Sequence, residues 1–181
     1  MDMRIEKTRR SIINAFLQLR SRKPLEKISV KELSALAEIN KATFYLHYRD
    51  IYDLSESLER ETVQSTLRSI QHPEVILTDI RSFIHQLGDA FVANEQLIKI
   101  LFEGSRSASF MEVFEDELMK VIHEVAPDHN SGQEGRMLVT YMMYGGYYTY
   151  FKYCDMGIKP VLELMEKLAG GIMSLYDVGE K

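Results

Sequence analysis

Apolar residues recur along most of this chain at intervals of three and four, the periodicity of α-helices that pack on one face. The first example begins at Ile12, since Ile12, Ala15, Phe16 and Leu19 occupy positions i, i+3, i+4 and i+7. We predict a first helix over about residues 4–20, ended by Pro24, because proline disfavours a helical residue before it. No segment shows a competing strand pattern, so the sequence predicts an all-α protein.

Two short helices with clear start signals follow. The stretch Ser29-Val30-Lys31-Glu32 is a capping box, in which the serine hydroxyl and the glutamate side chain each satisfy a backbone amide at the helix start. We therefore expect a second helix from Val30. Asn40 is an N-cap for a third short helix, and Asp50 caps a longer fourth helix to about residue 69. The apolar stripe of the second helix comprises Val30, Leu33, Leu36 and Ala37.

His72-Pro73 interrupts the helical pattern, and five further helices are predicted beyond it. They cover about residues 77–93, 95–101, 109–125, 133–156 and 160–176. Gly157 is expected to end the fourth of these, and Pro160 to occupy the first position of the last. The chain is thus expected to have about nine helices, arranged as a helix-turn-helix DNA-binding domain (1–50) and a helical ligand-binding and dimerisation domain (51–181).

The second and third helices, joined by Glu38-Ile39-Asn40, have the plan of a helix-turn-helix. At about 100° per residue, Phe44 and Tyr48 face inward. The opposite, exposed arc has apolar residues at its crest and polar residues on both flanks. Such an arc suits a DNA major groove, because apolar groups can contact thymine methyls while polar groups reach phosphates or purine edges. Its members are Ala42 and Leu46 at the crest, and Lys41, Thr43, Tyr45 and His47 on the flanks.

The charge distribution agrees with DNA binding by the N-terminal part of the chain. The net charge is −5, but residues 1–50 carry eleven Lys and Arg against six Asp and Glu, whereas residues 51–181 carry eleven against twenty-one. A basic segment on an acidic body is typical of a protein that meets a polyanion at one end only.

Residues 32–50, ELSALAEINKATFYLHYRD, resemble the signature of TetR-family transcriptional regulators, whose core reads approximately I/L-A-x-x-A-G-V-S-x-x-T-h-Y-x-H/Y-F. The resemblance extends over about residues 5–55. It implies a homodimer, DNA reading by the second and third helices, a sensor domain formed by the remaining helices, and repression relieved by a small ligand.

The resemblance also implies roles for single residues. Those that match recognition-helix positions used on DNA are Lys41, Ala42, Thr43, Tyr45 and His47. Those that match less uniform phosphate-contacting positions are Thr8, Arg9 and Ser29.

Two residues depart from the family pattern. Glu38 replaces the usual turn glycine, so the turn either lacks a left-handed residue or tolerates strain. Ile51 replaces the lysine that often begins the fourth helix and anchors a phosphate, which leaves Arg49 as the nearest substitute.

The two last predicted helices each carry a glycine pair and apolar residues on more than one face. Two copies of this pair would bury the surplus in a four-helix interface. We therefore expect a homodimer through the helices at 133–156 and 160–176, presenting two recognition helices about 34 Å apart to near-palindromic double-stranded DNA. The alternative is a thick monomer core.

Aromatic and methionine side chains are dense in the middle of the chain. They can line an apolar cavity, since thioethers adapt to varied shapes, or form a solid core. We expect a small, mainly apolar or aromatic effector between the helices at 77–93 and 133–156. The candidate lining residues are Phe83, Phe91, Phe102, Phe114, Met142, Met143 and Tyr144.

No catalytic, metal or cofactor site is expected. The histidines other than His47 lie too far apart in the sequence for two of them to bind one metal ion from the same helix. The glycine pairs lack the flanking residues of a phosphate-binding loop. The single cysteine, Cys154, cannot form an intrachain disulfide. No apolar run approaches the roughly 18 residues of a membrane span, and the charged N-terminus does not resemble a secretory signal. We therefore expect a cytoplasmic protein without membrane contact.

Together these patterns predict a non-enzymatic repressor that a small ligand releases from its operator. The alternative is a TetR-like module that docks another protein and has weak or no DNA binding, as the substitutions at Glu38 and Ile51 would favour.

Overall fold

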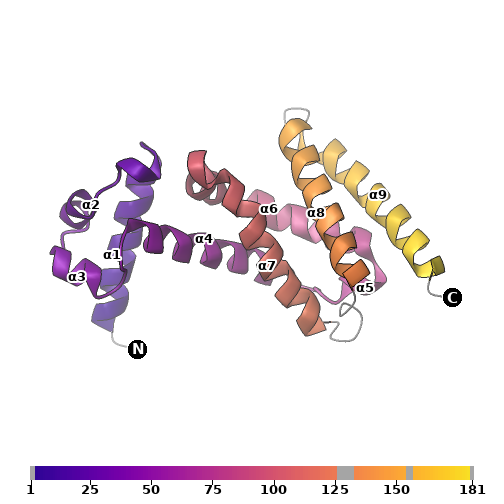
Figure 1. The fold of residues 1–181 in the computed structure, drawn as a ribbon, viewed down its shortest axis with the longest axis horizontal. Helices are drawn as coiled ribbons and strands as arrows, with labels where there is room; N and C mark the ends of the chain where they lie inside the picture. The colour runs from indigo at the N-terminus through magenta and orange to yellow at the C-terminus, as the bar shows by residue number, and fades with distance from the viewer. Residues whose placement is uncertain (1–2, 126–132, 154–156, 180–181) are drawn as a thin grey trace. The chain divides into compact units, whose positions relative to one another are not determined.

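The computed structural model describes residues 3–125, 133–153 and 157–179, and these form helices joined by short connections, with no strand among them (Figure 1). The predicted all-α class is therefore confirmed. The α-helices are α1 (Met3–Arg20), α2 (Val30–Leu36), α3 (Lys41–Tyr45), α4 (Ile51–Arg68), α5 (Val75–Thr78), α6 (Ile80–Phe102), α7 (Ser107–Val125), α8 (Gln133–Tyr153) and α9 (Ile158–Gly179). Single 3₁₀ turns lie at Leu25–Lys27 and Gly104–Arg106.

The predicted helix starts are confirmed by their caps. The Ser29 hydroxyl accepts a hydrogen bond from the Glu32 N–H at 3.2 Å, and Asn40 Oδ1 accepts one from the Thr43 N–H at 2.7 Å. Asp50 Oδ1 likewise accepts from the Asp53 N–H at 2.8 Å. Only half of the predicted capping box forms, because the Glu32 carboxylate pairs with Lys23 instead.

Three sequence predictions need correction. Most of the helix expected at 77–93 and all of the one expected at 95–101 form one continuous helix, α6, because the residue between the two ranges is neither glycine nor proline, whereas residues 77–78 belong to the separate short helix α5. Pro160 is the third residue of α9, not its first. Leu36, expected in a buried stripe, is exposed. Cys154 and the predicted helix end at 156 lie outside the described residues.

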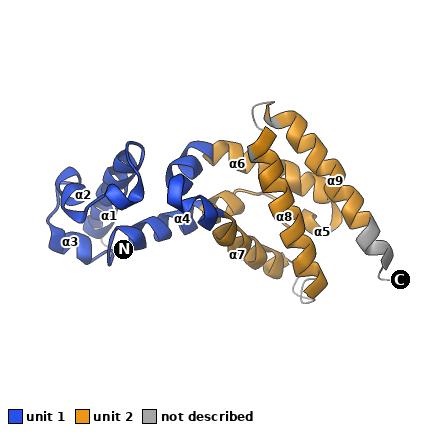
Figure 2. Ribbon diagram, turned by 45° about the horizontal axis from the view of Figure 1, so that its top comes forward, with its two compact units in different colours: residues 1–62, 95–110 blue, residues 63–94, 111–181 orange. Residues whose placement is uncertain are grey.

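The chain divides into two compact units, coloured separately in Figure 2. The first unit comprises residues 1–62 and 95–110, and the second comprises residues 63–94 and 111–181. Helices α4, α6 and α7 therefore each contribute residues to both units. The division of function expected between residues 50 and 51 stays a prediction.

The core of the first unit is built from apolar side chains of its α-helices and of the 3₁₀ turn Leu25–Lys27. The stripe predicted on α1 is buried, and the fully buried members of this core are Ile12, Phe16, Leu25, Leu33, Phe44, Leu54 and Leu101. Burial of each such side chain contributes about 1.5–3 kcal/mol. This core fixes α1, α2 and α3 against one another and against the start of α4.

Two arginines hold the segment 95–110 within the first unit. The buried Arg20 donates from Nη2 to the carbonyl oxygens of Leu101 at 3.2 Å and Glu103 at 3.1 Å. Arg106 donates from Nε to Oε1 of Glu59 at 2.9 Å, and Glu59 is fully buried. The Ser55 hydroxyl donates to the same carboxylate at 2.7 Å, so the buried charge of Glu59 is neutralised and hydrogen-bonded.

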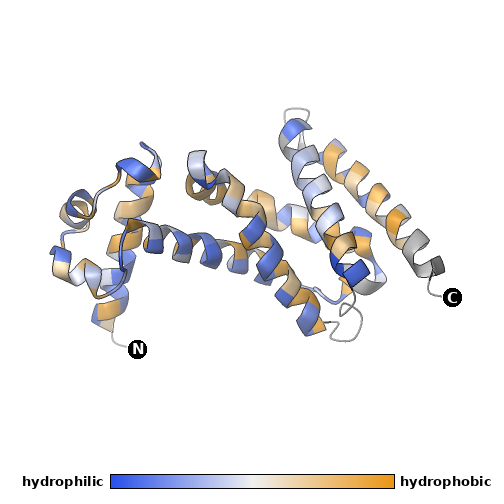
Figure 3. Ribbon diagram, in the orientation of Figure 1, coloured by the Kyte–Doolittle hydropathy of each residue, from blue (hydrophilic) through white to orange (hydrophobic). Residues whose placement is uncertain are grey.

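The second unit packs α6, α7, α8 and α9 through aromatic and aliphatic side chains. The rings of Phe91 on α6 and Phe114 on α7 meet edge to face, with centroids 5.4 Å apart. Gly88 allows α9 to approach α6, because a Cβ at that position would lie 2.7 Å from Leu162 Cδ1. Figure 3 shows α9 coloured as hydrophobic along most of its described length. No helix among the described residues is long and apolar enough to cross a membrane.

Candidate nucleic-acid interface

Helix α3 is a short helix whose rotational phase is fixed by one buried ring. Phe44 is fully buried, and Tyr48 just beyond the helix is buried beside it, with ring centroids 5.9 Å apart. Tyr45 packs edge to face on Phe44 at 5.5 Å. The predicted inward direction of Phe44 and Tyr48 is therefore confirmed, and the opposite side of α3 is available to solvent.

Four of the six residues predicted to form the exposed arc are exposed. Lys41, Ala42, Tyr45 and Leu46 are exposed, whereas Thr43 and His47 are half-buried. Leu46 is 85% exposed, the highest fraction among the large apolar side chains of the described chain. An apolar crest with polar flanks is thus presented on one side of α3 and the residues that follow it.

The polar side chains on this arc differ in whether they already form hydrogen bonds within the chain. The Thr43 hydroxyl donates to Asn40 Oδ1 at 2.9 Å, so its proton is used by the cap while its lone pairs remain open. Lys41, Tyr45 and His47 form no hydrogen bond or ion pair within the described part of the chain. Three donors are therefore free to meet an external partner.

The turn from α2 to α3 contains a left-handed residue, so of the two alternatives left open by the sequence it is the one that tolerates strain. Glu38 has a φ of 56°, in the left-handed region. Its N–H bonds to the Ala35 carbonyl at 3.3 Å, and the Ile39 N–H bonds to the Ser34 carbonyl at 3.0 Å. This is the Schellman pattern, which usually has glycine at the left-handed position. A side chain there costs roughly 1–2 kcal/mol.

The start of α4 confirms the predicted loss of a cation. Ile51 is buried in the first unit and offers no charge at this position. Arg49 is exposed, but its Nη2 lies 2.8 Å from Oδ1 of Asp53. The backbone N–H of Arg49 also donates to Asp53, and these bonds hold the pKa of Asp53 below its ordinary value. Arg49 is therefore accessible but already paired.

The residues predicted to contact phosphates from α1 and α2 also have partners within the chain. Arg9 forms an ion pair with Glu61 on α4. The Thr8 hydroxyl donates to the Arg4 carbonyl at 2.9 Å. The Ser29 hydroxyl is the N-cap of α2. Arg9 and Thr8 would therefore divide their donors between the present acceptor and a phosphate, or exchange one for the other, whereas the Ser29 hydroxyl accepts its cap bond and can still donate its proton.

Glu61 and Asp53 were missed by the sequence analysis as partners of the candidate cations. The Arg49 and Asp53 pair has the i, i+4 spacing that stabilises helices, so the spacing alone could have indicated it. Glu61 lies 52 positions from Arg9, and no local signal connects the two residues.

The residues predicted to line an effector cavity are not all in one unit. Phe83, Phe91 and Phe114 contribute to the second unit, where Phe83 and Phe114 are buried. Met142, Met143 and Tyr144 are half-buried on α8 of the same unit. Phe102 belongs to the first unit and packs on Phe110, with ring centroids 4.9 Å apart. The cavity itself stays a prediction, with six of its seven candidates in one unit.

Helices α8 and α9 expose apolar side chains in stripes. Met137, Tyr141 and Tyr148 on α8 are 64%, 69% and 65% exposed and lie within about 40° of one another around the helix. Leu164 and Leu168, one turn apart on α9, are also exposed. These stripes are apolar surface that the described chain leaves uncovered.

No model of a known protein family matches the chain, and no solved structure matches it. Within the described ranges, no three His, Cys, Asp or Glu residues lie together in a way that could hold a metal ion. The functional interpretation therefore depends on the chain's own residues and on the resemblance of residues 32–50.

Proposed function

We propose that this protein is a TetR-type transcriptional regulator that binds double-stranded DNA through a helix-turn-helix formed by α2 and α3. The observation that carries the proposal is the surface of α3, where Lys41, Tyr45 and His47 form no hydrogen bond or ion pair in the described chain and lie around an exposed apolar crest. Side chains of these kinds on one helix face are the means by which proteins contact base edges and phosphates in a major groove.

The local structure around α3 favours the same function. A helix that enters a groove must be held rigidly, and α3 is held by the Asn40 cap at its start and by buried Phe44 at its centre. The basic charge of residues 1–50 would add the sequence-independent attraction to phosphates. The further contacts proposed for phosphates are Thr8, Arg9, Ser29 and Arg49.

We also propose a homodimer through α8 and α9. One methionine and two tyrosines are exposed on one face of α8, and two leucines one turn apart are exposed on α9, and exposed apolar side chains grouped in this way are typical of interaction surfaces. A two-fold pairing of these helices would bury both stripes and would present two copies of α3 to a near-palindromic operator.

The regulatory part of the proposal is release from the operator by a small, mainly apolar or aromatic effector in the second unit. Such a ligand can act only through a difference in its affinity for the DNA-bound and free forms, and a tenfold change in operator affinity corresponds to about 1.4 kcal/mol of coupling. By the same linkage, operator DNA must weaken ligand binding tenfold. The proposed activity is binding, and no catalytic step is assigned to any residue.

A second candidate function is a TetR-like module that docks another protein. The exposure of Leu46, together with Tyr45 beside it, favours this candidate, because a large apolar side chain on a short helix can seat in a protein groove as well as against thymine methyls. The absence of any duplex binding would decide for the docking module.

The experiment that tests DNA binding is a titration of a mixed-sequence duplex, followed by fluorescence anisotropy at several KCl concentrations. The affinity should fall steeply with salt, with a log–log slope of magnitude several units. Lys41→Gln should weaken binding and reduce the slope by about one. Arg68→Gln, in the last turn of α4, also removes one positive charge but from an exposed position of the second unit, and should leave the slope unchanged. No binding at the lowest salt, or equal effects of the two variants, would contradict the proposal.

A further inference from the structure

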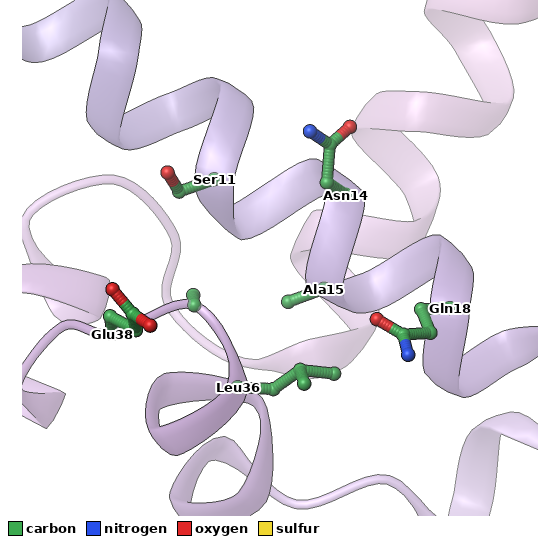
Figure 4. A pocket seen from close by; sticks show the side chains of 7 residues that line it. Ser11, Asn14, Ala15, Gln18, Leu36 and Glu38 are labelled. Atoms are coloured by element: carbon green, nitrogen blue, oxygen red, sulfur yellow. The ribbon is translucent and has the colours of Figure 1, made fainter.

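A cleft in the first unit lies between α1 and the end of α2. It has a volume of about 220 Å³ and is lined by Ser11, Asn14, Ala15, Gln18, Leu36, Ala37 and Glu38 (Figure 4). Figure 4 shows the four α1 side chains on one side and Leu36 and Glu38 on the other, with Ser11 and Glu38 toward one end and Gln18 beside Leu36 toward the other. The cleft is therefore polar around an apolar floor of Ala15, Leu36 and Ala37.

The polar side chains around this floor have no partner within the described chain. Ser11, Gln18 and Glu38 form no side-chain hydrogen bond or ion pair there. Two carboxylates elsewhere in the first unit are paired with cations, Glu61 with Arg9 and Glu32 with Lys23. Hydroxyl, amide and carboxylate groups are thus gathered in one hollow with their hydrogen-bonding capacity unused.

The charge of the cleft selects the kind of group that it can hold. Glu38 is the only formally charged residue in the lining. Lys7 and Arg22, one turn beyond Ser11 and Gln18 on either side, do not contribute to it. A carboxylate without a cation attracts positive charge and repels anions. The oxygens of Ser11 and Gln18 can accept further N–H bonds from the same cationic group.

The backbone at Glu38 is a second feature of the cleft, because the turn holds this residue in the left-handed conformation. The left-handed conformation of this residue strains any side chain, and glycine would relieve the strain. The sequence nevertheless places a carboxylate there, at the mouth of the cleft. Strained backbone of this kind is more frequent at ligand-binding positions than elsewhere.

We propose that this cleft binds the ammonium or guanidinium group of a small aliphatic cation. Glu38 forms the ion pair, Ser11 and Gln18 accept the remaining N–H bonds, and the apolar floor covers the methylene carbons next to the charge. The volume is below the roughly 300–1,000 Å³ of sites for drug-sized ligands, so the occupant is a group the size of one side chain. The inference does not depend on DNA binding, because cation binding is measured without DNA.

The test is an NMR titration of the isotope-labelled full chain with n-butylammonium and n-butylguanidinium chloride, at constant ionic strength maintained with KCl. Saturable shifts of the Gln18 side-chain amide and the Glu38 backbone amide are expected with both cations. The neutral 1-butanol and the anionic butyrate should bind at least tenfold more weakly. Equal affinity for 1-butanol, or no saturable shift with either cation, would overturn the proposal.

The variants separate the role of the charge from that of the fold. Glu38→Gln keeps the shape of the side chain and should lower cation affinity at least tenfold. Glu103→Gln removes one carboxylate from the same unit without touching the cleft, and should leave affinity unchanged. The spectra themselves report whether each variant is folded. Equal losses in the two variants would show a general charge effect and contradict the assignment.

A peptide distinguishes a free cation from the side chain of a partner protein. A capped Gly-Arg-Gly peptide presents the same guanidinium as n-butylguanidinium, with a backbone on either side. Similar or weaker binding of the peptide is expected for a site that takes a small molecule. Binding tenfold tighter than that of n-butylguanidinium would assign the cleft to a partner chain and contradict the small-molecule source.

Discussion

Both carboxylate oxygens of Glu61 on α4 bind the guanidinium of Arg9 on α1, with Nη2 lying 2.6 Å from Oε2. The Ser57 hydroxyl donates to the same carboxylate at 3.2 Å. Arg9 is one of the residues proposed to contact a DNA phosphate. A phosphate at this position would therefore have to displace the Glu61 carboxylate or share the Arg9 guanidinium with it.

Replacing the carboxylate should strengthen DNA binding. In Glu61→Gln, the Arg9 guanidinium loses its ion-pair partner and can neutralise one more phosphate, so the salt slope should increase in magnitude by about one. Anisotropy titrations against KCl measure both the affinity and the slope. In Arg9→Ala/Glu61→Gln, the additional slope should be lost. An unchanged slope in Glu61→Gln would show that Arg9 does not meet a phosphate.

Neighbouring aromatic residues of α3 should have opposite roles. Phe44→Ala removes a fully buried ring and should lower the free energy of unfolding by about 3–5 kcal/mol. Tyr45→Ala and Thr43→Ala alter the exposed or half-buried arc, so they should weaken DNA binding while the protein stays folded. Thermal and denaturant melts, followed by duplex titration, measure both effects. Wild-type melting of Phe44→Ala together with collapse of Tyr45→Ala would show that the phase of α3 is wrong.

The turn between α2 and α3 should be stabilised by glycine. Glu38→Gly relieves the strain of the left-handed conformation, and after the greater flexibility of unfolded glycine is subtracted, the gain is about 0.5–1 kcal/mol. Denaturant unfolding measures it. Ala35→Gly, one turn earlier within α2, is the matched control and should destabilise the protein by about 1 kcal/mol. Destabilisation by both substitutions would contradict the strain assigned to Glu38.

Much of the first unit could be predicted because its signals are local. Ser29, Asn40 and Asp50 each mark a helix start, and each cap depends on residues only three positions apart. The phase of α3 follows from the spacing of Phe44 and Tyr48. The same local pattern brought together the exposed residues of the candidate DNA-binding surface.

The features that the sequence did not predict depend on distant contacts. The join at residues 93–95 contains no helix breaker and continues as one helix, although the apolar pattern changes there. Arg9 is paired with a residue 52 positions away, which no periodicity reveals. The left-handed form of Glu38 was one of two open alternatives, because a side chain at this position disfavours the conformation that the turn geometry requires.

Selection from a random duplex pool at low salt tests together whether residues 1–50 read DNA and whether α8 and α9 pair two copies of the chain. We expect the purified chain to enrich a near-palindrome whose half-sites lie about one helical turn apart, or a multiple of it. Tyr141→Glu, which places a charge in the exposed stripe of α8, should lose this enrichment while remaining folded. Failure of the unaltered protein to enrich any sequence would contradict DNA reading and would leave the docking module as the function.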